Sequence, residues 1–213
     1  MQSRFFKLQE EKQKKIIDAG LEEFSAKGYE QARTERITEK AGIAKGLLFH
    51  YFGTKRAFFL FLLDYGLRLV QNEMLEKMKP SGDIFARIKE VNYLKIRLIQ
   101  KHPALFNFLM EAGVRGLEKH NNEFEARISE RIASIRRDTF RQLTEDLDTS
   151  FFREDVDIEK ALEILLWFVE GFQEKALEEY GEMRVEEMDY DSLLEELDAY
   201  CDLLRWGFYR QDG

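Results

Sequence analysis

Cysteine and histidine are scarce in this chain, and their scarcity limits its chemistry. Cys201 is the single cysteine among 213 residues, so a disulfide cannot form within the chain. A lone thiol fits a reducing cytoplasm, where structural disulfides are rare. The three histidines, at positions 50, 102 and 120, lack the short spacings typical of metal ligands. We therefore expect a cytoplasmic protein that holds no metal and no cofactor.

Proline and long apolar runs are scarce as well. With 2 prolines, few positions can break a helix, and the regular spacing of apolar residues favours an all-α fold. The longest apolar run, Ala57 to Leu63, is far shorter than the ~20 residues of a membrane-spanning helix. The N-terminal residues are charged and lack the apolar core of an export signal. These features predict a chain that neither crosses a membrane nor is exported.

Motifs typical of enzymes are missing too. The sequence has no phosphate-binding loop, nucleophile elbow or paired-histidine motif. Its 41 acidic residues include adjacent pairs such as Glu178-Glu179, but neighbours in a helix do not share a face, so these pairs are expected on the solvated surface. We expect no enzymatic activity.

Apolar spacing and local stop signals predict nine helices and no strand. Gly28 ends the first helix, Thr54 caps the fourth, Asp157 caps the eighth, and Pro80-Ser81-Gly82 forms the clearest interruption. The predicted helices cover residues 6–27, 33–40, 45–52, 55–79, 84–100, 104–117, 123–147, 158–179 and 190–209.

The most informative segment runs from Thr34 to Lys55. Two short helical patterns flank a turn that contains Gly42, and the second pattern carries lysine, small residues and aromatic rings. Two helices joined by a short glycine-containing turn form the helix-turn-helix pattern, whose second helix enters the DNA major groove. The motif is expected at about residues 33–52.

These residues resemble the DNA-binding signature of the TetR family of bacterial transcriptional regulators. The resemblance lies in residues 41–46 (AGIAKG) and 49–55 (FHYFGTK), and residues 16–24 with Lys27-Gly28-Tyr29 are similar to that family's first helix. It covers about residues 10 to 70. It implies a three-helix DNA-binding domain followed by a larger helical domain for ligand binding and dimerisation.

Three positions depart from the family pattern. Ala44 stands where the family usually has serine, which removes an N-cap hydroxyl and about 1 kcal/mol of helix stability. Phe49 stands where tyrosine is usual, so a hydroxyl that contacts phosphate is absent. The family's capping threonine falls at Ala32 or Arg33, which leaves Thr34 as a displaced candidate.

Charge is divided unevenly along the chain, whose net charge is −8. Residues 1–56, here called the head, hold 12 Lys and Arg against 8 Asp and Glu, a net charge of +4. Residues 57–213, here called the body, hold 21 and 33, a net charge of −12. DNA affinity comes largely from phosphate neutralisation, so a basic head on an acidic body suits a DNA-binding protein, although surface charge also fluctuates without function.

The DNA contacts are expected on and around the second motif helix. Lys45 and Lys55 suit phosphates, Gly46 allows close approach of the backbone, and Leu47 or Leu48 suits a thymine methyl. His50 either reads a base edge or packs on the neighbouring helix, and Phe49 and Phe52 are expected in the core. The predicted DNA-binding residues are Thr34, Lys45, Gly46, Leu47, Leu48, His50, Tyr51, Thr54 and Lys55.

Large aromatic residues are spread over several helices of the body. They form either a solid core or the lining of an apolar cavity for a small apolar or amphipathic effector. The resemblance favours the cavity, because members of the family often bind an effector in this domain. The predicted lining consists of Tyr65, Tyr93, Arg97, Phe106, Phe108, Met110, Trp167, Phe168 and Phe172.

Apolar residues of the last helix recur at alternating spacings of 4 and 3, which is typical of a helix packed along a partner. The preceding helix is apolar on more than one face and needs more than one neighbour. These helices are either central in a monomer or paired between subunits. The predicted homodimer interface consists of Leu162, Leu166, Val169, Leu194, Leu197, Cys201, Leu204 and Phe208.

Taken together, these patterns predict a dimeric transcriptional regulator that binds a palindromic operator in duplex DNA. Release by a small-molecule effector is expected, and repression is favoured over activation. The alternative is a helical protein–protein interaction module without DNA binding, and the basic head argues against it.

Overall fold

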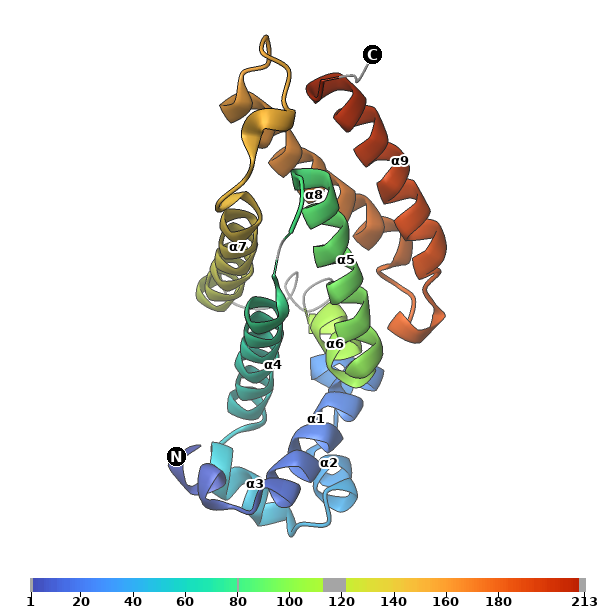
Figure 1. Cartoon of the computed structure of the whole chain (residues 1–213). Helices are drawn as coiled ribbons and strands as arrows, with labels where there is room; N and C mark the ends of the chain where they lie inside the picture. The colour runs from blue at the N-terminus through green and yellow to red at the C-terminus, as the bar shows by residue number, and fades with distance from the viewer. Residues whose placement is uncertain (1, 80, 113–121, 211–213) are drawn as a thin grey trace. The chain divides into compact units, whose positions relative to one another are not determined.

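A computed structural model describes residues 2–79, 81–112 and 122–210, and these residues form α-helices joined by turns and short 3₁₀ helices (Figure 1). Among them no strand forms beyond an isolated bridge between Phe152 and Tyr209. The elements in order are η1 (Gln2–Lys7), α1 (Glu10–Gln31), α2 (Thr34–Lys40), α3 (Lys45–Phe52), α4 (Lys55–Lys77), α5 (Ile84–Lys101), α6 (Pro103–Met110), α7 (Asn122–Thr144), η4 (Thr149–Phe151), α8 (Ile158–Tyr180), η5 (Val185–Glu187) and α9 (Tyr190–Phe208). The predicted all-α fold is confirmed.

Local capping residues set several helix starts, as the sequence predicts. The Thr54 hydroxyl accepts the Ala57 N–H at 3.0 Å at the start of α4. Asp157 Oδ1 accepts the Lys160 N–H at 3.2 Å at the start of α8. Pro103 is the first residue of α6, where its fixed φ suits a helix and its missing N–H costs nothing.

The first helix differs most from its predicted range. It begins at Glu10 and not at Phe6, because residues before it form the separate 3₁₀ helix η1. Gly28 has φ +65° and interrupts the helix as predicted, but helical backbone continues to Gln31. The predicted end of the sixth helix, at residue 117, lies outside the described residues.

The chain forms two compact units. Unit 1 consists of Met1–Gln71 and Lys101–Arg131. Its core is aromatic: the ring of Phe24 lies 5.1 Å from Phe59 and 6.2 Å from Phe108, measured between centroids. Gly20 lets α1 approach α4, because a Cβ at this position would lie 2.6 Å from the Phe58 ring.

Unit 2 consists of Asn72–Gln100 and Ile132–Gly213. Arg87 of α5 is buried, and its guanidinium donates to the carbonyl oxygens of Leu143 at 3.0 Å, Glu145 at 2.6 Å and Asp146 at 3.2 Å. These carbonyls lie at the end of α7, where helix carbonyls lack intrahelical partners. One buried cation therefore satisfies the end of α7 and joins it to α5.

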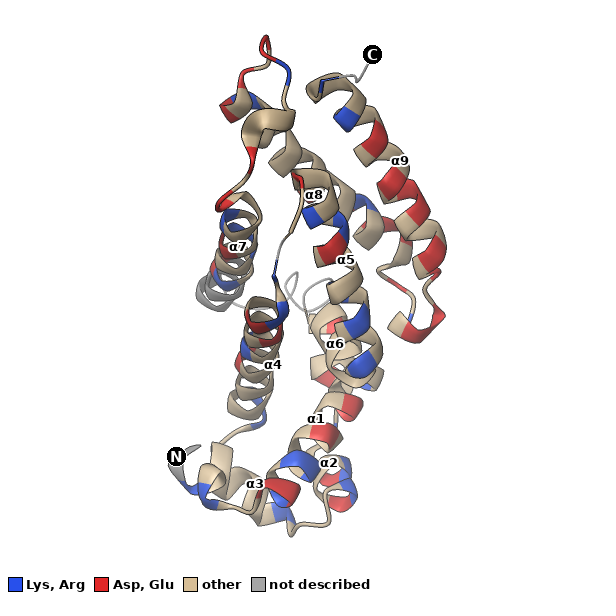
Figure 2. Ribbon diagram, viewed as in Figure 1, with Lys and Arg blue, Asp and Glu red and all other residues tan. Residues whose placement is uncertain are grey.

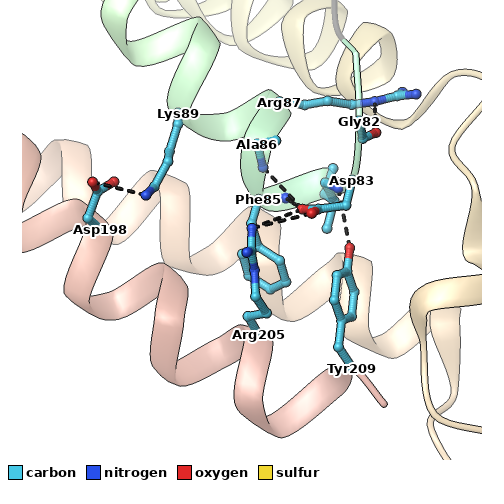
Figure 3. Close-up of polar contacts among 10 residues, drawn as sticks. Gly82, Asp83, Phe85, Ala86, Arg87, Lys89, Asp198, Arg205 and Tyr209 are labelled. Atoms are coloured by element: carbon cyan, nitrogen blue, oxygen red, sulfur yellow. Dashed lines mark hydrogen bonds and ion pairs between the residues drawn. The ribbon is translucent and has the colours of Figure 1, made fainter. Parts of the chain in front are cut away.

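The start of α5 is also tied to α9 (Figure 3). Asp83 accepts backbone N–H groups from Phe85 and Ala86, and it pairs with Arg205. Lys89, further along α5, forms an ion pair with Asp198 at 3.0 Å. Two ion pairs therefore connect the start of α5 and its second turn to α9.

Candidate nucleic-acid interface

The turn between α2 and α3 is a Schellman motif. Gly42 has φ +64°, a conformation that glycine adopts at little cost. The Ile43 N–H donates to Thr38 O at 2.9 Å, and the Gly42 N–H donates to Glu39 O at 3.1 Å. These bonds end α2 and direct the chain into α3, as the helix-turn-helix pattern predicts.

Two faces of α3 have different surroundings. Leu48, Tyr51 and Phe52 are buried, with exposed fractions of 1%, 7% and 3%. They share a face because residues three and four apart lie on the same side of a helix. The other residues of α3 face away from the core. Four of them are exposed and Leu47 is half-buried; the exposed ones are Lys45, Gly46, Phe49 and His50.

This placement corrects three predictions from sequence. Leu48 and Tyr51 were expected to face DNA, but both pack in the core, and the Tyr51 ring lies 6.1 Å from Phe5. Phe49 was expected in the core with Phe52, but it is 37% exposed because it lies on the same side as Lys45, one turn earlier. The exposed face of α3 is therefore smaller than the sequence predicts.

Two threonines in the predicted set lie at helix starts. Thr34 is buried at the start of α2, and its hydroxyl donates to Glu35 Oε2 at 3.4 Å. It does not cap the helix, since the N-cap residue is Arg33, whose side chain makes no capping bond. Thr54 is exposed and caps α4. Ala44, at the N-cap of α3, makes no side-chain bond, as expected.

The predicted phosphate-contacting lysines already have partners within the chain. Lys45 Nζ lies 2.5 Å from Glu35 Oε1, and this hydrogen bond lowers the pKa of the Glu35 carboxyl. Lys55 Nζ donates to Glu30 O at 3.1 Å and lies 4.8 Å from the centroid of the Tyr29 ring. Ion pairs between exposed side chains stabilise a fold little, so the Lys45 ammonium can exchange Glu35 for a phosphate at low cost.

A residue outside the predicted set reaches α3 from the N-terminal segment. Arg4 Nη1 lies 3.1 Å from Nε2 of His50, and both side chains are exposed. The neighbouring Phe5 is fully buried. Sequence reasoning missed both residues because they precede the first predicted helix and carry no motif.

Charged residues are distributed over the helices as the sequence predicts (Figure 2). Basic residues lie on η1, α3 and the start of α4, α2 carries two basic and two acidic residues, and α9 carries a series of acidic residues with Arg205 near its end. The basic balance of the head thus lies on the elements next to and including α3.

The predicted effector residues divide between the two units. In unit 1, Phe108 is fully buried, with its ring 5.2 Å from Phe59, so it is part of a packed core. Tyr65 is half-buried, and burial raises the pKa of its hydroxyl. Phe106 and Met110 are also half-buried.

In unit 2, Phe168 and Phe172 lie within 6.3 Å of the Tyr200 ring, measured between centroids. Tyr93 is 48% exposed and Trp167 is 60% exposed. Arg97 is exposed as well. Side chains so exposed do not line an enclosed cavity within unit 2, and an effector site lined by Tyr93, Trp167 and Arg97 stays a prediction.

The predicted dimer interface is corrected in part. Leu197 and Cys201 are 2% and 1% exposed within a single chain, so a second subunit cannot reach them. Burial raises the pKa of the Cys201 thiol to about 11. The other predicted residues are half-buried: Leu162, Leu166, Val169, Leu194, Leu204 and Phe208.

A different apolar surface of α8 and α9 is exposed. Leu203 is 70% exposed, Trp206 is 71% exposed, and Trp167 is 60% exposed. Ile164 and Tyr200 are 39% and 40% exposed. We call these five residues the α8–α9 apolar face.

Two further observations concern the described residues alone. None of their helices has the length and apolar character needed to span a bilayer. No group of three or more His, Cys, Asp or Glu side chains among them is arranged to hold a metal ion.

Comparison with known proteins agrees with this geometry. Residues 16–61 match the family described as bacterial regulatory proteins, tetR family. The HTH-type transcriptional regulator RutR of Escherichia coli K12 is 33% identical over 131 residues, which cover 58% of this chain and 60% of RutR. The HTH-type regulator YdgC of Bacillus subtilis is 25% identical over 175 residues, covering 78% of this chain and 82% of YdgC.

Solved structures share the fold over most of the chain. A TetR family regulator from Chloroflexus aurantiacus has a TM-score of 0.61 and 24% identity, with 98% of each chain covered. FadR of Bacillus subtilis, determined in complex with stearoyl-CoA, has a TM-score of 0.64 and 21% identity, with 90% of this chain and 96% of FadR covered. The match at residues 16–61 agrees with the helix-turn-helix geometry and identifies this segment as similar to the DNA-binding region of the tetR family, and the solved structures show that the same fold extends over most of the chain.

Proposed function

We propose that this protein is a transcriptional regulator that binds duplex DNA in a sequence-specific manner through α3. The observation that carries the proposal is the exposed face of α3, where Lys45, Gly46 and His50 follow a Schellman turn on a basic segment. A short helix held in this way, with its opposite face in the core, suits the major groove. RutR is an HTH-type transcriptional regulator, and the matching family consists of bacterial regulatory proteins, which supports this proposal.

Each residue of this surface has a role that follows from its chemistry. Lys45 and Lys55 contact phosphates, and Gly46 leaves room for the DNA backbone. Leu47 is half-buried and suits a thymine methyl, and His50 donates to a base edge. Thr54 and the start of α4 lie next to these residues in sequence and complete the DNA-binding surface.

We further propose that the protein is a repressor released by a small apolar or amphipathic effector. Residues 1–56 would bind DNA and residues 57–213 would bind the effector and a second subunit. A neighbour of the same fold was crystallised with stearoyl-CoA, which supports an effector site in this architecture. An effector acts by preferring one body conformation over another, and α4 is the helix that continues from the head into the body.

The active form would be a homodimer that binds a palindromic operator in the cytoplasm. Two recognition helices must sit about 34–36 Å apart to read successive major grooves. The α8–α9 apolar face supports this assembly, because large apolar side chains that are as exposed as Trp206 and Leu203 are candidates for burial at a subunit interface.

Binding-site selection with the purified full chain, followed by fluorescence anisotropy with the selected duplex, tests the proposal. We expect Lys45→Ala with His50→Ala to lose preference for the selected sequence. Lys175→Ala on α8, which also removes one exposed positive charge, is the control. Selection that enriches no sequence, with no salt-dependent affinity for duplex DNA, would favour a protein–protein interaction module instead.

A further inference from the structure

Phe5 anchors the short helix η1 to the core beneath α3. Its side chain is fully buried, and its ring lies 5.0 Å from Phe52 and 5.2 Å from Phe61, measured between centroids. With Phe6 and Tyr51, four aromatic rings lie around it. Aromatic pairs at these distances stabilise a packed arrangement beyond simple burial. The residue before Phe5 is therefore held at a fixed place beside the recognition helix.

Arg4 occupies that place and donates to His50. Arginine has five N–H groups and no acceptor, so His50 Nε2 must be the acceptor in the 3.1 Å contact. A neutral imidazole whose Nε2 accepts carries its proton on Nδ1. The contact thus selects one tautomer of His50, with Nδ1–H as its donor. It also leaves most of the guanidinium N–H groups of Arg4 unused by this bond.

The surroundings of Arg4 are basic and exposed. η1 contains Arg4 and Lys7 and no acidic residue, and both basic side chains are exposed. α3 contains Lys45 and His50 and has no acidic residue either. The guanidinium fork matches the geometry of a phosphate group and binds it through two N–H groups at once.

We propose that Arg4 is an additional DNA contact, binding a backbone phosphate beside α3 while it holds His50 in the Nδ1–H tautomer. The proposal rests on the proposed function, because it assigns a second element to the same DNA interface. Arg4 then contributes affinity through the phosphate and contributes sequence preference through the donor that His50 presents.

The test compares Arg4→Ala, Arg4→Lys and the control Lys175→Ala with the wild-type chain. The duplex recovered by binding-site selection is titrated at several KCl concentrations. Loss of one phosphate contact should reduce the slope of log affinity against log salt by about 0.9, so affinity falls about eightfold at 0.1 M salt and about fourfold at 0.2 M. Arg4→Lys should restore most of the slope, because it keeps the charge.

A second readout addresses the His50 tautomer. ¹⁵N NMR of histidine-labelled protein without DNA should show the proton of His50 on Nδ1 in the wild type, and a mixture of tautomers in Arg4→Ala. Unchanged melting temperature would show that the fold is intact, since Phe5 remains.

The outcomes separate the two proposals. If the wild type binds the selected duplex but Arg4→Ala matches Lys175→Ala in affinity and slope, Arg4 is not a DNA contact and the proposed function stands. If the slope falls but the tautomer does not change, the positioning role is wrong. If the wild type does not bind duplex DNA, both proposals fail.

Discussion

Arg205 of α9 pairs with Asp83 at the start of α5. Arg205 Nη2 lies 3.2 Å from Oδ1 and 3.3 Å from Oδ2 of Asp83. Asp83 Oδ1 also accepts the N–H groups of Phe85 at 2.8 Å and Ala86 at 3.1 Å (Figure 3). One carboxylate therefore caps α5 and binds α9 at the same time.

Replacing Asp83 should separate these two contributions. Asp83→Asn keeps an oxygen that can cap α5 but removes the charge, so we expect a loss of about 1 kcal/mol in the free energy of unfolding. Asp83→Ala removes the cap as well, and the loss should reach about 2 kcal/mol or more. Urea denaturation measures both. Asp155→Ala, which breaks an exposed pair with Arg153, should change stability little. Equal losses in the two Asp83 variants would contradict the capping role.

Two glycines should respond to alanine in opposite ways. At Gly20 a Cβ would lie 2.6 Å from the Phe58 ring and 2.7 Å from Leu62, so Gly20→Ala should destabilise the fold by about 1–3 kcal/mol. At Gly46 nothing lies within 4 Å, so Gly46→Ala should leave the fold as stable or raise its stability by up to about 1 kcal/mol.

Gly46→Ala should nevertheless weaken operator binding, because the added methyl group lies on the exposed face of α3. Thermal unfolding and anisotropy titration of the same preparation measure the two effects. Full operator affinity in Gly46→Ala would show that DNA does not approach the backbone at this residue.

Lys95 of α5 should destabilise the fold at neutral pH. The Lys95 side chain is half-buried, and its desolvation, with a smaller effect of the Arg136 charge, lowers its pKa. A lysine whose folded pKa is lowered is disfavoured while it is protonated, and the penalty is relieved as pH rises towards the unfolded pKa of 10.5. Lys95→Met should therefore raise the melting temperature at pH 7, and its advantage should shrink at higher pH. A lower melting temperature in Lys95→Met at pH 7 would show that the charged lysine stabilises the fold.

Cys201 should be unreactive in the folded protein. Its thiol is 1% exposed, and burial raises its pKa from 9.0 to about 11. The thiolate is the reactive form, so modification by a disulfide reagent at pH 8 should follow unfolding. Because the folded pKa is raised, this group stabilises the fold fully below pH 9 and loses that effect as pH rises towards 11. Rapid modification without added denaturant would show that the α9 packing opens easily.

Helix limits could be predicted because their signals are local. Thr54, Asp157 and Gly42 act within three residues of themselves, so their effect can be read from the sequence. The two faces of α3 could not be assigned, because an eight-residue helix with five apolar residues has no clear polar side. Phe5, which is distant in sequence, packs against Tyr51 and Phe52 and so helps to set which face is buried.

The same reason explains the corrected dimer surface. The regular spacing through Leu197 and Cys201 does mark a packed helix face, but that face packs within the chain, where Lys89 binds Asp198 and Arg205 binds Asp83. Periodicity shows that a face is buried and does not show which neighbour covers it. The less regular positions Leu203 and Trp206 are exposed in the single chain, and the proposed homodimer would cover them.

This distinction leads to opposite results for two leucines of α9. Leu203→Glu places a charge on a side chain that is 70% exposed, so the monomer should fold normally and the dimer should dissociate. Leu197→Glu buries an unpaired charge in the core and should unfold the chain, with a loss of several kcal/mol. Sedimentation velocity gives the oligomeric state, and thermal unfolding gives the stability. Leu203→Glu should also bind the operator much more weakly, because a single half-site contributes too little affinity. A dimer of full stability in Leu203→Glu would exclude the α8–α9 apolar face as the subunit interface.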